Sequence, residues 1–135
     1  MAFKHGLRKF FLLIALSCTL SASIGAEERC PVVVIGGGVA GLTSATFLAR
    51  SGIAPIVITG PVIGGAIAQS HNVENWPGEL SISGVDLSEK MRSQAEALGA
   101  DLRAEELISV DFSQQPYLIT TRPLFGDGQL KTYRT

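Results

Sequence analysis

The sequence predicts an α/β fold in which a parallel βαβ unit is followed by a small antiparallel meander. Two apolar runs, "PVVVI" at 31–35 and "APIVIT" at 54–59, flank three consecutive glycines and a segment of helical period at 39–51. Strand, glycine turn, helix and strand within about 30 residues form a βαβ unit, whose crossover is right-handed in nearly all proteins. The chain has 135 residues, 46% of them hydrophobic, which suffices for one core but not for two ordinary domains.

The first 26 residues differ in composition from the rest of the chain. Lysine and arginine residues precede the apolar run "FFLLIALSCTL" (10–20), and the small residues "SASIGA" (21–26) follow it. This order is typical of a secretory signal peptide, and the apolar run is shorter than the roughly 20 residues of a membrane helix. We therefore expect residues 1–26 to be a signal peptide cleaved before Glu27, and the protein to be exported to the periplasm or secreted. A retained membrane anchor and a mis-assigned start codon are the alternatives.

The export route has two finer alternatives. "ALSC" at 15–18 partly matches a lipoprotein box. "RKFFL" at 8–12 resembles the twin-arginine export signal, with Lys9 in place of the second arginine. The twin-arginine route carries proteins that are already folded around a cofactor.

Charge and cysteine content exclude several classes of function. Residues 1–26 hold three of the 11 basic residues and none of the 12 acidic ones, so the remaining chain has a formal charge of −4. A mildly acidic chain argues against nucleic acid as a partner. Cys30 is the one cysteine left after residue 26, so no internal disulfide, dithiol pair or cysteine metal site can form there. We expect no metal site.

Local sequence patterns predict the helix, strands and loop in the first half of the chain. Apolar residues recur on one helical face over 39–51, and Gly52 supplies a left-handed stop. The continuous β-branched run at 31–35 suits a strand that is buried on both faces of a parallel sheet, and a second apolar strand follows at 54–59. Residues 60–84 are rich in glycine, proline and asparagine and have no clear period, so we expect a long ordered loop there.

A second helix is expected over 86–98, where apolar residues again recur at helical spacing. Ser83 and Asp86 fit a capping box at its start, and Gly99 closes its far end. Short alternating segments follow and predict the meander. They lie at 108–112, 117–121 and 129–134, separated by the turns "SQQP" and "GDG". In the first of them, Ile108, Val110 and Phe112 are expected to share one face.

The glycine turn indicates what the βαβ unit binds. Backbone N–H groups at a helix N-terminus can hold a phosphate only where no Cβ stands between them. In "GGGVAG" (36–41), Gly36 allows the tight turn, Gly38 lets a pyrophosphate approach the backbone, and Gly41 lets the helix lie close to the sheet. Because this G-x-G-x-x-G motif lies between a predicted strand and a predicted helix, it predicts a Rossmann-like dinucleotide-binding unit. A purely structural glycine turn is the alternative.

The end of the second strand indicates which dinucleotide fits. The usual fingerprint has an Asp or Glu there, about 20 residues after the glycines, to bind the ribose hydroxyls. Here the strand ends in "ITG" (58–60), and no acidic residue occurs between Glu28 and Glu74. This weakens an ordinary NAD site, so other groups must hold the ribose.

A family resemblance starts at this point of the sequence. "VITGPVIGGA" (57–66) followed by "NVENWPG" (72–78) resembles the FAD-binding domain of low-molecular-weight thioredoxin reductases, whose second strand characteristically ends in Thr-Gly. The likeness runs from Val32 to about Thr132. It implies that residues 27–135 are part of a Rossmann-like FAD/NAD(P)-binding domain that is incomplete at its C-terminus, within a longer reading frame.

By position, the resemblance assigns a contact with the FAD pyrophosphate to Gly36, Gly38, Val39, Ala40 and Gly41. Val39 departs from the family pattern, which often has proline there. The first turn of a helix tolerates either residue.

The resemblance also assigns the remaining contacts with FAD. The residues are Thr59 and Gly60 at the adenosine ribose, Gly64, Gly65 and Ala66 beneath the phosphate and ribityl part, Asn75 near the isoalloxazine ring, and the backbone of Leu107 at the adenine. Ala66 stands where glutamine is common in the family, so it lacks that side-chain amide.

Members of this family reduce a thioredoxin-like disulfide protein with NADPH, through FAD and a Cys-x-x-Cys pair in a second domain, and form homodimers. The chain has neither that pair nor a second glycine fingerprint. The resemblance therefore implies the FAD-binding part of a disulfide oxidoreductase, with no catalytic residue and no disulfide reduction by this chain alone. A non-catalytic or vestigial dinucleotide-binding domain is the alternative, and a Rossmann protein that binds only a nicotinamide cofactor is the third.

Overall fold

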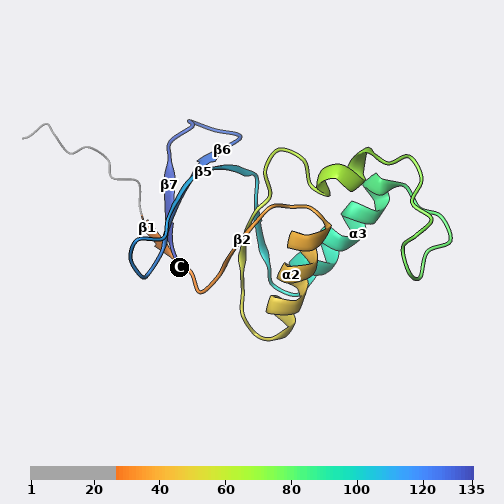
Figure 1. The fold of residues 1–135 in the computed structure, drawn as a ribbon, viewed down its shortest axis with the longest axis horizontal. Coiled ribbons are helices and arrows are strands. Elements are labelled where there is room, and N and C mark those ends of the chain that lie inside the picture. The colour runs from red at the N-terminus through yellow and green to blue at the C-terminus, as the bar shows by residue number, and fades with distance from the viewer. Residues whose placement is uncertain (1–26) are drawn as a thin grey trace, which may run out of the picture.

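The computed structural model describes residues 27–135, and the predicted signal peptide lies outside this part of the chain. The described residues form two sheets, with helices packed on one of them (Figure 1). The strands are β1 (Glu27–Arg29), β2 (Val33–Ile35), β3 (Ile56–Ile58), β4 (Asp101–Arg103), β5 (Glu105–Asp111), β6 (Leu118–Pro123) and β7 (Lys131–Arg134). The helices are α2 (Val39–Arg50), the 3-10 helix η1 (Gly65–Gln69) and α3 (Gly84–Ala97).

The first sheet is parallel, with the order β2-β3-β4, which confirms the predicted βαβ unit. The expected burial of 31–35 on both faces is wrong, because β2 lies at the edge of this sheet and Ile35 is 48% exposed, whereas β3 is buried throughout. Val57, at the middle of β3, is fully buried and packs with Ala45 of α2 and Ala95 of α3. β4 was not predicted, because its three residues, "DLR", carry too little apolar pattern to indicate a strand. Tertiary packing against β3 makes it one.

The second sheet has the order β1-β7-β6-β5 and contains the predicted meander. β5 pairs antiparallel with β6, and β6 pairs antiparallel with β7. β1 is a further strand that pairs parallel with β7, with Glu27 opposite Thr132. Its sequence, "EER", has no strand signal of its own.

The alternation expected in β5 is interrupted. The register shifts between Leu107 and Ser109, and Ile108, at the shift, is 41% exposed. Phe112, just past the strand, is 71% exposed and contacts the Tyr117 ring edge-on. Val110 packs against the core formed with Ile119. An irregularity in strand pairing moves neighbouring side chains away from the face that simple alternation assigns.

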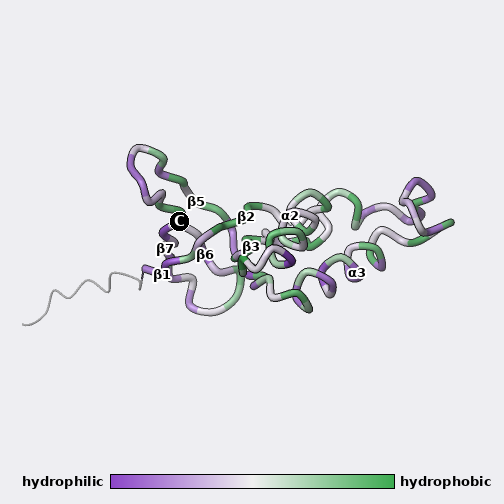
Figure 2. The backbone as a smooth tube through the Cα atoms, turned by 90° about the horizontal axis from the view of Figure 1, so that it is seen from below, coloured by the Kyte–Doolittle hydropathy of each residue, from purple (hydrophilic) through white to green (hydrophobic). Residues whose placement is uncertain are grey.

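The observed ends of α2 and α3 agree with the stop and capping signals in the sequence. α2 ends at Arg50, and Gly52 follows with φ +81°, as a left-handed stop requires. The Ser83 hydroxyl caps α3 by accepting a hydrogen bond from the Asp86 amide at 3.0 Å. In Figure 2 the tube alternates between hydrophobic and hydrophilic along α3, as expected for a helix with one buried face. No helix within residues 27–135 is long and apolar enough to span a membrane.

The loop expected over 60–84 is ordered by local structure. It contains η1, and Val73 pairs with Ile82 in an isolated antiparallel bridge. These two residues pack on Leu87 of α3, with Trp76 beside them. The loop is therefore fixed against α3 by a small apolar cluster of its own.

Candidate dinucleotide-binding site

The glycine turn connects β2 to α2 at the edge where β3 also ends. The Gly36 amide donates to the carbonyl oxygen of Ile58 at 2.8 Å, and the Gly37 amide donates to that of Thr59 at 3.1 Å. Gly38 is the N-cap of α2, where no side chain caps the helix and no acidic residue lies in the first turn. The first amides of α2, and the positive end of its dipole, are thus available to an anion.

The three motif glycines are required for different reasons. Gly36 has φ +108°, a conformation that residues with a Cβ rarely adopt. A Cβ on Gly41 would lie 1.8 Å from the carbonyl oxygen of Gly36. A Cβ on Gly38 would meet no protein atom closer than the Gly64 carbonyl oxygen at 3.8 Å, and Gly38 has an ordinary φ of −79°. The protein itself leaves room at Gly38, so the bare backbone there fits a bound phosphate group.

The second segment of the site is the turn after β3. The Thr59 amide donates to the carbonyl oxygen of Arg103 at 3.0 Å, and the Gly60 amide donates to that of Glu105 at 3.0 Å. Thr59 is 5% exposed, and its hydroxyl lies 3.1 Å from the Arg103 carbonyl oxygen. The Thr59 side chain is therefore directed into the protein, and the turn presents mainly backbone at the surface of the site.

The third segment is the start of η1. The Gly64 amide donates to the Gly37 carbonyl oxygen at 2.7 Å, and a Cβ on Gly65 would lie 3.5 Å from the Cα of Gly38. Ala66 follows on the exposed side of η1. The fold thus brings the predicted pyrophosphate residues into contact with residues 64–66, although more than 20 residues separate them in the chain.

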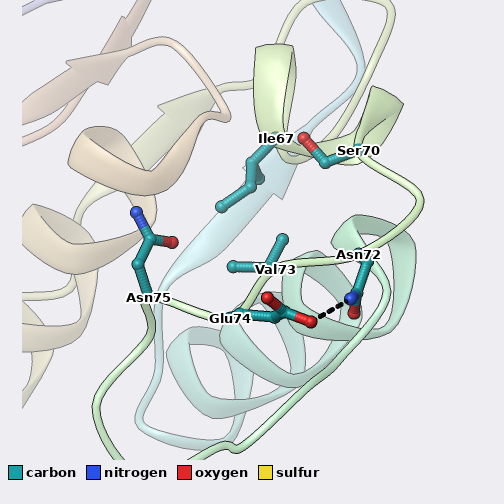
Figure 3. A pocket seen from close by; sticks show the side chains of 6 residues that line it. All are labelled: Ile67, Ser70, Asn72, Val73, Glu74 and Asn75. Atoms are coloured by element: carbon teal, nitrogen blue, oxygen red, sulfur yellow. Dashed lines mark hydrogen bonds between the residues drawn. The ribbon is translucent and has the colours of Figure 1, made fainter.

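Asn75 lies further out, at a hollow of about 530 Å³ in the loop (Figure 3). The Asn72 amide donates to the Glu74 carboxylate at 2.7 Å, and the Asn75 side chain points away from this pair. Within residues 27–135 the Asn75 side chain makes no hydrogen bond and is exposed, so its amide is free to bind a ligand.

Leu107 is in β5, two residues after Glu105, whose carbonyl oxygen accepts the Gly60 amide. Its partner across the strand pair is Thr121. The backbone of β5 therefore begins beside the Thr59–Gly60 turn.

Two glycines outside the predicted set also shape the site. A Cβ on Gly37 would lie 2.8 Å from the Thr59 Cβ, and a Cβ on Gly84 would lie 1.7 Å from the Ile67 carbonyl oxygen. Gly37 occupies a variable position of the motif, so the motif gives no signal for it. Gly84 lets the start of α3 approach η1, and no local sequence pattern indicates that contact.

This arrangement defines a dinucleotide-binding unit of the Rossmann type: a parallel strand, a glycine turn without side chains, and an uncapped helix N-terminus. The sequence model of the FAD dependent oxidoreductase family matches residues 31–134. The chain belongs to that family.

Relatives with similar sequences include thioredoxin reductases and an ammonia-lyase. It is 42% identical over 106 residues to NADPH-dependent thioredoxin reductase 3 of Arabidopsis thaliana, covering 75% of this chain and 20% of the relative. It is 36% identical over 90 residues to glucosaminate ammonia-lyase of Pseudomonas fluorescens, covering 66% of this chain and 28% of the relative.

Among solved structures, thioredoxin reductase from Giardia duodenalis is similar, with a TM-score of 0.70 and 29% identity. The match covers 79% of this chain and 34% of that one. Each named protein is therefore much longer than the region it shares with this chain. The homology confirms the predicted family resemblance and the α/β fold.

Proposed function

We propose that the chain binds FAD across the glycine turn, and the room at Gly38 is the observation that carries this proposal. A Cβ there would meet no protein atom closer than 3.8 Å, so the fold by itself does not require a glycine. A pyrophosphate resting on the uncapped N-terminus of α2 does require one.

The other segments follow the length of an extended FAD molecule. The Thr59–Gly60 turn and the backbone at Leu107 would face the adenosine. Gly64 and Gly65 would lie under the phosphate and ribityl part, and the free Asn75 amide would hydrogen-bond near the isoalloxazine ring. Bound FAD supplies electron transfer, and backbone and amide groups tune the flavin without adding a charge.

We further propose that this unit serves an NADPH-linked disulfide oxidoreductase that acts on a thioredoxin-like protein as a homodimer. The similarity to an NADPH-dependent thioredoxin reductase supports this proposal. The sequence contains neither a Cys-x-x-Cys pair nor a second glycine fingerprint, so this chain alone should not reduce disulfides. A non-catalytic or vestigial dinucleotide-binding domain is the second candidate, and the lack of a Cys-x-x-Cys pair in this sequence favours keeping it.

We also propose that residues 1–26 direct export of the protein. The arrangement of basic, apolar and small residues supports this proposal. A twin-arginine route would allow FAD to be loaded before export.

Titration of the purified full chain with FAD, FMN and NAD tests cofactor binding. We expect FAD to bind in a one-to-one ratio, seen as flavin that stays with the protein through gel filtration. Tight NAD binding without flavin uptake would contradict the proposal and favour the nicotinamide-only alternative. The proposed role in a disulfide oxidoreductase is tested by sequencing the gene downstream of codon 135. A reading frame that continues without a Cys-x-x-Cys pair would rule out disulfide reduction.

A further inference from the structure

A buried carboxylate lies at the start of β5. Glu105 is 2% exposed, and its carboxylate accepts hydrogen bonds from the Thr121 hydroxyl at 2.6 Å, the Tyr133 hydroxyl at 2.7 Å and the Lys131 ammonium at 2.7 Å. A buried charge is costly unless it is paired and hydrogen-bonded. Here the partners come from β6 and β7, so the carboxylate ties three strands of the second sheet together.

Arg103, at the end of β4, extends this network to the first sheet. Its guanidinium donates to Glu28 at 2.5 and 2.8 Å, to Asp101 at 2.6 Å and to the Tyr133 hydroxyl at 3.0 Å. The guanidinium carbon also lies 5.2 Å from the centre of the Tyr133 ring. The Tyr133 hydroxyl therefore accepts from Arg103 and donates to Glu105, joining the two residues.

The same two residues hold the turn after β3 through their backbone. The Arg103 carbonyl oxygen accepts the Thr59 amide, and the Glu105 carbonyl oxygen accepts the Gly60 amide, both at 3.0 Å. Within residues 27–135 these two amides donate to no other backbone carbonyl. The side chains that fix residues 103 and 105 in the second sheet therefore also fix the position of the Thr59–Gly60 turn.

We propose that Glu105 and Arg103, joined through Tyr133, are positioning residues for the adenosine half of the cofactor. They act through the Thr59–Gly60 turn and the adjacent β5 backbone, and contact no cofactor themselves. This inference rests on the proposed binding of FAD. The competing explanation is that the network only stabilises the contact between the two sheets.

Amide hydrogen exchange in the cofactor-free chain separates the two explanations. Glu105→Gln should speed exchange at the Thr59 and Gly60 amides by roughly tenfold more than at Leu42 and Gly64, whose amides bond to Gly38 and Gly37. Glu106→Gln is the matched control, since Glu106 is exposed and its carboxylate lies 3.8 Å from Arg122. An equal rise at all four amides would show a merely structural role and overturn the inference.

Tyr133→Phe keeps the aromatic ring and leaves the Glu105 carboxylate in place. It removes the hydroxyl that joins Glu105 to Arg103. This variant should fold and show the same selective exchange if Glu105→Gln does not fold. In either variant the Kd for ADP, which carries only the adenosine and pyrophosphate, should rise roughly tenfold, whereas Glu106→Gln should leave it unchanged.

An unchanged Kd for ADP despite faster exchange at Thr59 and Gly60 would overturn the positioning role alone. If the unmodified chain binds neither FAD nor ADP, the proposed function fails, and this inference fails with it. An unchanged Kd for ADP leaves FAD binding intact, so failure of the positioning role can be distinguished from failure of the proposed function.

Discussion

The Cβ position of Gly41 faces the carbonyl oxygen of Gly36, and an added methyl group would lie 1.8 Å from that oxygen. No contact so close is possible, so α2 can start beside β2 only because residue 41 has no side chain. Gly38, in the same motif, has open space at its own Cβ position. The close approach of α2 to the glycine turn thus depends on Gly41, and the proposed binding of FAD depends on Gly38.

Gly38→Val should abolish flavin uptake and leave the fold intact. The new methyl groups would occupy the space proposed for the pyrophosphate, whereas the φ of −79° at Gly38 is allowed for valine. We expect no flavin to stay with the variant and the free energy of unfolding to fall by no more than about 2 kcal/mol, because valine is a poorer helix N-cap than glycine, measured by urea denaturation. Ala54→Val, outside the site, is the control. Retained flavin in the Gly38 variant would contradict the assigned site.

Gly41→Ala should destabilise the fold itself. The methyl group would force α2 away from the Gly36 carbonyl, which costs about 3 kcal/mol or more. Circular dichroism during urea denaturation measures the loss. A stability equal to that of the unmodified chain would show that the close approach between α2 and the glycine turn is wrong.

Acid should weaken the fold through Glu105. Burial raises the pKa of this carboxyl, but hydrogen bonds from Lys131, Thr121 and Tyr133 lower it by more, so the net pKa is below its usual value. The ionised form therefore stabilises the folded state above the unfolded pKa of about 4.3, and this contribution is lost as the pH falls through the lower folded pKa. We expect the free energy of unfolding to decrease below about pH 4, and Glu105→Gln to flatten that decrease. An unchanged slope in Glu105→Gln would exclude this carboxylate as the source.

Ser83→Ala should remove the cap of α3. The Ser83 hydroxyl accepts from the Asp86 amide at 3.0 Å and donates to the Asp86 carboxylate at 2.6 Å. Loss of such a cap costs about 1 kcal/mol, seen as a lower urea midpoint. Ser93→Ala, on the exposed face of α3, should have no such cost, and a similar loss in both variants would argue against capping.

Deletion of residues 1–26 should keep a reporter fusion inside the cytoplasm. The full chain fused to the same reporter should be exported, because the predicted signal peptide is present. Fractionation of cells followed by a reporter assay gives the result. Export that does not depend on residues 1–26 would show that this segment is not a signal peptide.

Local patterns predicted most of the parallel unit because strand, turn and helix signals there depend on neighbouring residues. The ends of α2 at Gly52 and of α3 at Ser83 follow from such signals. β1 and β4 could not be predicted, since three residues with little or no apolar pattern become a strand only when a partner strand is placed beside them. The same holds for the register shift in β5, which depends on its pairing with β6.

The sequence by itself determined the family and the glycine motif, and it predicted a candidate site that did not include Gly37 and Gly84. Only the tertiary structure decided why Gly37 and Gly84 are needed, because the atoms that a Cβ would meet there come from distant segments: Thr59 for Gly37 and Ile67 for Gly84. It also buried Glu105, a residue type that sequence analysis assigns to the surface, by surrounding it with donors from β6 and β7. Contacts between distant segments depend on register and packing, which no local pattern specifies.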